Sequence, residues 1–151
     1  MTETNREKDI ESVYAFLYKE RTPFARACLS GEGENADVRG DVLFYETPLG
    51  VLVRAELCGM KSRMIRKKRI YNFCVRDGAD SACRHASAGD KRSWCAVMPT
   101  AYEKDGCADC VIITRKIRPT DIIGKTIVMF ERANGCPKSV TDAVAYGRIE
   151  S

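Results

Sequence analysis

The residues of this chain that could do chemistry are its cysteines, because histidine is almost absent. The 151 residues include eight cysteines but only one histidine, His85. A metal site built from several imidazoles is therefore excluded, and any metal centre would need thiolate or carboxylate ligands. The N-terminal segment is polar and contains neither an apolar leader core nor a membrane-spanning run, so we expect a cytosolic protein with no membrane partner. In that compartment cysteines are free thiols by default.

Two of the cysteines, Cys107 and Cys110, form a C-x-x-C pair. This spacing occurs in zinc knuckles and in thiol–disulfide redox sites. The pair opens an apolar run at residues 111–113 that is typical of a strand, and residues three apart on a strand point to opposite faces. Joint chelation would need a turn at residues 105–107, and a second C-x-x-C is absent from the sequence. We therefore expect packing thiols here, with a structural zinc site as the alternative.

A basic segment at residues 61–69 is the strongest concentration of charge. It contains six basic side chains, namely Lys61, Arg63, Arg66, Lys67, Lys68 and Arg69. Such a cluster could bind nucleic acid, an acidic partner or an anionic surface. It has no interleaved aromatic side chain on which bases could stack, and the net charge of the chain is only +4. We interpret it as a solvated loop that leads into a strand, and we do not expect nucleic-acid binding.

One amphipathic helix is predicted near the N-terminus, over residues 4–20. Four apolar residues with helical spacing share one face of it, namely Ile10, Val13, Tyr14 and Leu17. Pro23 ends the helix. We expect residues 1–23 to form a helical extension that packs across its own domain, and the alternative is a helix that binds a partner.

From residue 24 onward the apolar residues alternate with a period of two, which is typical of strands. The predicted strands are residues 24–30, 38–46, 51–58, 69–76, 94–98, 107–114, 125–131 and 143–149. The intervening loops are predicted at residues 77–93, 99–106 and 132–142. The clearest strand turns Val51, Val53, Ala55 and Leu57 to one side, and a turn at residues 47–50 joins it to the preceding strand as a hairpin. This pattern predicts one all-β domain over residues 24–151, an eight-stranded Greek-key barrel or sandwich with the added N-terminal α-helix.

Three segments, taken together, resemble the copper/zinc superoxide dismutase family. They are Tyr71-Asn72-Phe73-Cys74-Val75-Arg76, followed by Cys83 and Ala88-Gly89-Asp90; Asp121-Ile122-Ile123-Gly124-Lys125 with its strand to Phe130; and Ala145-Tyr146-Gly147-Arg148-Ile149. They are similar, in order and spacing, to the family's G-F-H-x-H strand with its downstream Cys and H-x-G-D segment, its D-x-x-I-G-[KR]-x-x-x-x-H strand and its C-terminal A-C-G-x-I. The resemblance covers residues 24–149. It implies a Greek-key barrel and, in family members with intact ligands, superoxide dismutation at copper.

The copper ligands that the resemblance implies are all replaced in this chain. Cys74 and Arg76 stand where the family has two copper histidines, and Phe130 stands where it has a third. Copper that cycles between two charge states is suited by imidazole ligands. An arginine adds a permanent positive charge where the cation would lie, and a phenylalanine offers no lone pair.

The zinc-binding part of the resemblance is also incomplete. Asp90 alone stands at a ligand position of the family, and His85 lies two residues out of register. Ala143 stands where the family has the basic residue that guides the anion to copper. Tyr146 replaces the cysteine that would pair with Cys83.

These departures predict a superoxide dismutase-like protein without catalysis and without a bound cofactor or metal. Its role would be structural or partner-binding, and a homodimer or another homo-oligomer is one form that this could take. One alternative is a dismutase or other redox enzyme that holds copper or zinc in a rebuilt site. The candidate ligands for that site are Cys74, His85, Asp90, Cys107 and Cys110. The other alternative is binding of nucleic acid or an anionic surface through residues 61–69.

Overall fold

The computed structural model describes residues 21–61, 69–77, 98–135, 137, 139 and 142–151 of the chain. The helix expected over residues 4–20 lies outside the described residues. So do His85, Asp90 and all but the last residue of the strand expected at 94–98.

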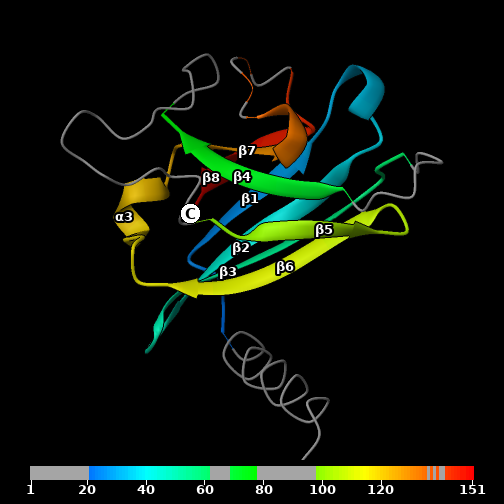
Figure 1. The fold of residues 1–151 in the computed structure, drawn as a ribbon. Coiled ribbons are helices and arrows are strands. Elements are labelled where there is room, and N and C mark those ends of the chain that lie inside the picture. Colours follow the sequence, from blue (N-terminus) through cyan, green and yellow to red (C-terminus); the bar gives the residue numbers. More distant parts are fainter. Residues whose placement is uncertain (1–20, 62–68, 78–97, 136, 138, 140–141) are drawn as a thin grey trace, which may run out of the picture.

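Within the described residues, eight antiparallel strands form one closed barrel (Figure 1). The strands are β1 (Ala25–Ser30), β2 (Arg39–Thr47), β3 (Gly50–Cys58), β4 (Ile70–Arg76), β5 (Thr100–Lys104), β6 (Cys107–Thr114), β7 (Thr126–Glu131) and β8 (Ala145–Glu150). Around the barrel they follow the order β1-β2-β3-β6-β5-β4-β7-β8, and β8 pairs with β1. Closure leaves no strand edge unpaired. The predicted all-β, eight-stranded barrel is therefore confirmed.

The barrel interior is filled by the alternating apolar residues of the strands. On β3, Val51, Val53, Ala55 and Leu57 are buried in the main core cluster. Between them Arg54 and Glu56 point outward and form an ion pair at 3.2 Å. The predicted β2–β3 hairpin is also present, because Thr47 pairs with Gly50 across a two-residue turn. Seven of the eight predicted strands match observed strands to within two residues.

The prediction of a loop at residues 99–106 is wrong, because this segment contains β5. Only Ala101 is fully buried, whereas the Tyr102 side chain is 57% exposed. A single small apolar residue gives no visible alternation in the sequence. The strand forms because β4 and β6 pair with it on both sides.

Three short helical turns accompany the barrel among the described residues: η1 (Gly33–Asn35), α3 (Pro119–Ile122) and η2 (Arg132–Asn134). Figure 1 shows α3 at one end of the barrel, where Ile122 is completely buried. No helix in the described part of the chain is long and apolar enough to cross a bilayer.

Two smaller apolar clusters lie on the outside of the barrel. One is centred on Tyr45 and Leu52, and the other on Val128 and Ala143. The second cluster adjoins the residues that the sequence singled out on β4 and β7.

Candidate functional site on the outer face of β4 and β7

The structure places Cys74, Arg76 and Phe130, which the sequence singled out, on one outer face of two neighbouring strands. Tyr71, Phe73 and Val75 of β4 fill the barrel core. Successive side chains of a strand alternate, so Cys74 and Arg76 point outward. On β7 the core residues are Ile127 and Met129, and Phe130 therefore also points outward.

The pairing of β4 with β7 fixes how these side chains are arranged. Cys74 lies opposite Val128, and Phe130 lies opposite Asn72, one row further along the ladder. Cys74 and Phe130 are therefore diagonal neighbours, which in an antiparallel pair are about 7–8 Å apart. Arg76 lies in the next row, opposite Thr126. Because side chains alternate along β4, Asn72 shares this face with Cys74 and Arg76.

This outer face is covered, although it lies outside the barrel. Cys74 is 0% exposed, Arg76 is 2% exposed and Phe130 is 6% exposed. The guanidinium of Arg76 donates through Nη2 to the carbonyl oxygen of Pro137, so the chain around residue 137 contributes to the cover. The face therefore contains a buried, permanently charged group.

Polar contacts close the two ends of this face. At one end Lys125 forms an ion pair with Asp77. At the other end Arg132 donates through Nη2 to Asn72 Oδ1 and to Thr100 Oγ1, both at 3.3 Å. Arginine and lysine side chains thus lie around Cys74 and Phe130, and their positive charge opposes a cation bound there.

The prediction of free, packing thiols is wrong for two of the candidate ligands, Cys74 of β4 and Cys107 of β6. Cys107 forms a disulfide with Cys58, its direct partner in the β3–β6 ladder, with Cα atoms 4.0 Å apart. Cys74 is also disulfide-bonded, to a partner outside the described residues. A sulfur atom in a disulfide has no thiolate lone pair to offer a metal.

The C-x-x-C pair is split between the two faces of β6, as the strand prediction required. Cys110 is a free thiol that packs against the barrel core, whereas Cys107 joins Cys58 on the outside. Burial raises the pKa of Cys110 to about 12. Its thiol therefore stays protonated, and the pair cannot chelate one ion together.

His85 and Asp90, the two other candidate ligands, lie outside the described residues. In the described ranges, no group of three or more His, Cys, Asp or Glu side chains is arranged to hold a metal ion.

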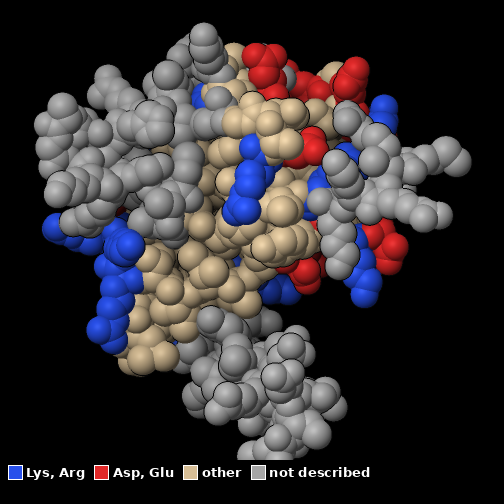
Figure 2. Space-filling model, in the orientation of Figure 1, with Lys and Arg blue, Asp and Glu red and all other residues tan. Residues whose placement is uncertain are grey.

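The structure describes Lys61 and Arg69, the two ends of the basic segment. The Arg69 side chain makes contacts within the fold. Arg69 forms an ion pair with Glu103 at 3.0 Å and donates to the carbonyl oxygen of Lys61. The remaining basic residues, Arg63, Arg66, Lys67 and Lys68, lie outside the described residues. Figure 2 shows both signs of charge on the visible face, with basic side chains at the left edge and acidic ones mainly at the top and right.

Two further replaced positions have structural contacts that the sequence did not signal. Ala143 is 3% exposed and packs with Val128 and Tyr146 in the outer cluster. The Tyr146 hydroxyl donates to the Glu32 carboxylate, and this hydrogen bond raises the pKa of Tyr146. At this position β8 is thus linked to the chain before η1 by a hydrogen bond.

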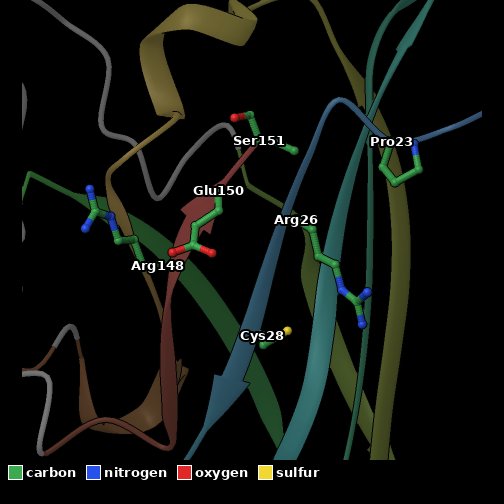
Figure 3. Close-up of a pocket in the computed structure, with 7 residues that line it drawn as sticks. Pro23, Arg26, Cys28, Arg148, Glu150 and Ser151 are labelled. Atoms are coloured by element: carbon green, nitrogen blue, oxygen red, sulfur yellow. The ribbon is translucent and has the colours of Figure 1, made fainter.

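A hollow of about 500 Å³ lies on the outer surface of β1 and β8 (Figure 3). Its lining includes Arg26, Cys28 and Arg148, and Cys28 also lines an adjoining hollow of about 390 Å³. Figure 3 shows the Arg26 and Arg148 side chains pointing away from one another, so the two cations do not converge on a ligand. Ligand sites usually have polar groups that converge on the ligand, and this hollow lacks that feature.

Comparison with known proteins adds no family name. No protein-family model matches the chain, and no curated protein matches it.

Proposed function

We propose that this chain is a superoxide dismutase-like barrel that has no copper–zinc catalysis and serves a structural or partner-binding role. The observation that carries the proposal is the arrangement of Cys74, Arg76 and Phe130. Phe130 is far from Cys74 and Arg76 in the sequence, yet all three lie together on one buried face. They correspond to the ligand positions that the resemblance implies.

The strand order supports the fold part of the proposal. β4, β5 and β6 are consecutive neighbours, and β7 returns to lie beside β4. Three consecutive strands with a fourth beside the first are the defining arrangement of a Greek key. This is the topology that the resemblance implies.

Electrostatics supports the absence of catalysis. A divalent cation about 4 Å from a guanidinium is repelled by about 8 kcal/mol at an effective dielectric constant of about 20. A difference of that size corresponds to a loss of affinity on the order of a million-fold. Arg76 is buried, so solvent screens this repulsion little. Phe130 supplies no lone pair, and the neutral disulfide sulfur of Cys74 supplies no thiolate that compensates.

The two alternatives gain less support from the described residues. Of the candidate ligands that the structure describes, Cys74 and Cys107 are in disulfides and Cys110 is a protonated thiol on the inner face. Binding of an anionic surface by residues 61–69 would have to do without Arg69, which is paired with Glu103.

The test is metal analysis of the folded, oxidised chain after exposure to copper and zinc and removal of excess ions. We expect substoichiometric metal and no superoxide consumption that a chelator abolishes. Stoichiometric copper or zinc together with chelator-sensitive superoxide consumption would overturn the proposal.

A pair of matched double variants gives this test a positive control. Arg76→His with Phe130→His removes the charge and supplies two imidazoles, and this variant should bind more copper than the native chain. Arg76→Lys with Phe130→Leu keeps the charge and the apolar bulk, so it should bind no more than the native chain. Circular dichroism checks that both variants retain the barrel.

A further inference from the structure

The outer surface of β2, β3 and β6 carries a continuous apolar strip. We name this feature the outer strip, and it consists of Leu43, Tyr45, Leu52, Val111 and Ile113. The strip faces away from the core, because the adjacent residues Phe44, Val53 and Ile112 belong to the core cluster. In the ladder, Leu52 lies between Tyr45 on one side and Ile113 on the other.

The outer strip is deeply buried at Tyr45 and Leu52 and only partly buried at Leu43, Val111 and Ile113. Leu52 is 0% exposed and Tyr45 is 6% exposed, although both point outward. On the same outer face of β3, the Glu56 side chain is 58% exposed. The outward face of a solvated sheet is normally polar, so an apolar strip on that face favours an occupant that covers it.

The path of the chain leads from this strip to the N-terminal segment. Phe24 donates its backbone N–H to the carbonyl oxygen of Phe44 at 2.9 Å. Arg21 donates through Nη1 to the carbonyl oxygen of Glu46 at 3.1 Å. Traced from residue 24 back to residue 21, the chain therefore runs along β2 towards its C-terminal end. Residue 20 directly precedes Arg21, which contacts the immediate neighbour of Tyr45.

We propose that the N-terminal segment, residues 4–20, is the occupant, and that its apolar face docks on the outer strip. From Ile10 to Leu17 a helix extends about 10 Å, at about 1.5 Å per residue. Three adjacent strands are about 10 Å wide, at about 4.8 Å between neighbours, so the two apolar surfaces match in length. A helix of this length is marginal alone in water, and burial of its apolar face stabilises it. This inference does not depend on the proposed function.

The first test is hydrogen exchange, followed by mass spectrometry, on the full chain and two variants. In the native chain we expect the amides of residues 4–20 to exchange more slowly than an unprotected peptide by on the order of tenfold or more. Val13→Asp places a charge on the apolar face and should abolish this protection. Ser12→Asp places the same charge on the opposite face and should retain it.

The reciprocal test changes the barrel surface. Ile113→Asp on the outer strip should free residues 4–20 to exchange, while the amides of β4 stay protected. Tyr102→Asp changes an exposed side chain of β5 outside the strip and should leave residues 4–20 protected. If Ile113→Asp also unprotects β4, the milder Ile113→Ser replaces it.

Three outcomes would overturn the inference. Residues 4–20 of the native chain exchange without protection, or their protection survives both Val13→Asp and the Ile113 variant. In the third outcome the protection rises with protein concentration, and a second copy of the chain would then cover the strip.

Discussion

Cys28 is exposed on β1, yet its surroundings hold its thiol in the neutral form. A hydrogen bond with Asp41 is the largest cause that raises the Cys28 pKa, and desolvation adds to it. Arg26, which pairs with Asp41 at 3.2 Å, acts in the opposite direction. An exposed thiol in such surroundings is a weak nucleophile, because the thiolate is the reactive form.

The first prediction concerns alkylation of Cys28 by iodoacetamide at pH 8. Asp41→Asn removes the main cause of the raised pKa, so alkylation should become faster than in the native chain. Arg26→Gln removes the opposing charge and should make alkylation slower. Peptide mass spectrometry of Cys28 over time measures both rates. If both rates equalled the native rate, Asp41 and Arg26 would have no role in setting this pKa.

The second prediction concerns Cys110 and the pH dependence of stability. The Cys110 pKa rises from 9.0 to about 12 in the folded chain, mainly through burial. Between these values the unfolded chain releases the proton and the folded chain keeps it, so stability present below pH 9 is lost as the pH rises. Urea unfolding at pH 8 and pH 10 should show a larger loss for the native chain than for Cys110→Ala, by at most about 1.4 kcal/mol per pH unit. Equal losses would contradict the burial of this thiol.

For individual residues of the candidate site, the sequence predicted some features and not others. The strand at residues 69–76 was predicted, and the period of a strand puts Asn72, Cys74 and Arg76 on one face of it. The disulfides of Cys58 with Cys107 and of Cys74 were not predicted. Cysteine connectivity depends on which strands become neighbours, and residues that are 49 positions apart carry no local signal of it.

At the scale of elements, the disulfide fixes the point where β3 ends and β6 begins. Met60 donates its backbone N–H to the carbonyl oxygen of Gly106 beside it, at 3.0 Å. The covalent link spans 49 residues of sequence, and closure of such a loop in the unfolded chain corresponds to about 4 kcal/mol in the chain-entropy account.

The third prediction is that Cys58→Ala with Cys107→Ala lowers the free energy of unfolding by up to about 4 kcal/mol. Urea unfolding under non-reducing conditions measures this loss. Cys28→Ala, which removes an exposed free thiol, is the matched control and should change stability little. A double variant as stable as that control would show that the β3–β6 ladder does not need the link.

The fourth prediction concerns the seam where β8 pairs with β1 and closes the barrel. A Cβ atom added at Gly147 would lie 2.1 Å from the backbone oxygen of Cys28. The backbone cannot move away without opening this ladder. Gly147→Ala should therefore lower the free energy of unfolding by about 1–3 kcal/mol or more. Hydrogen exchange should show lost protection in β1 and β8 but not in β5. Unchanged protection of the seam would contradict the close approach.

Among the elements, the strands with a regular alternation of apolar residues were predicted, and a strand with weak alternation was missed. β3 and β6 were predicted within one residue because each carries a regular apolar face. β5 was missed, although Asp105 and Gly106 form an Asp-Gly pair with φ values of 54° and 80°. That pair is a strong hairpin signal and could have located the strand before it.

At the scale of the whole molecule, a barrel or a sandwich was predictable from the number and spacing of short strands. The order in which the strands pair was not, because β3 and β6 are neighbours across a long stretch of sequence. Only the family resemblance implied a topology. Its most specific segment, Asp121-Ile122-Ile123-Gly124-Lys125, includes the buried Ile122 of α3 and continues into β7.

The disulfides also bear on the cellular compartment in which the protein folds. The polar N-terminal segment predicts a cytosolic protein, and in the cytosol cysteines are free thiols by default. Disulfides persist mainly in oxidising compartments, so the link of Cys58 with Cys107 favours such a compartment over the cytosol. Location stays a prediction, and the chain should be prepared in its oxidised form for every experiment above.

The most direct test of the central claim is a search for a metal ion at the outer face of β4 and β7. Crystals of the oxidised chain, grown after exposure to copper and zinc, would be measured by anomalous diffraction at both absorption edges. We predict no anomalous peak among Cys74, Arg76 and Phe130, because the buried guanidinium repels a cation. A peak coordinated on that face would contradict the account.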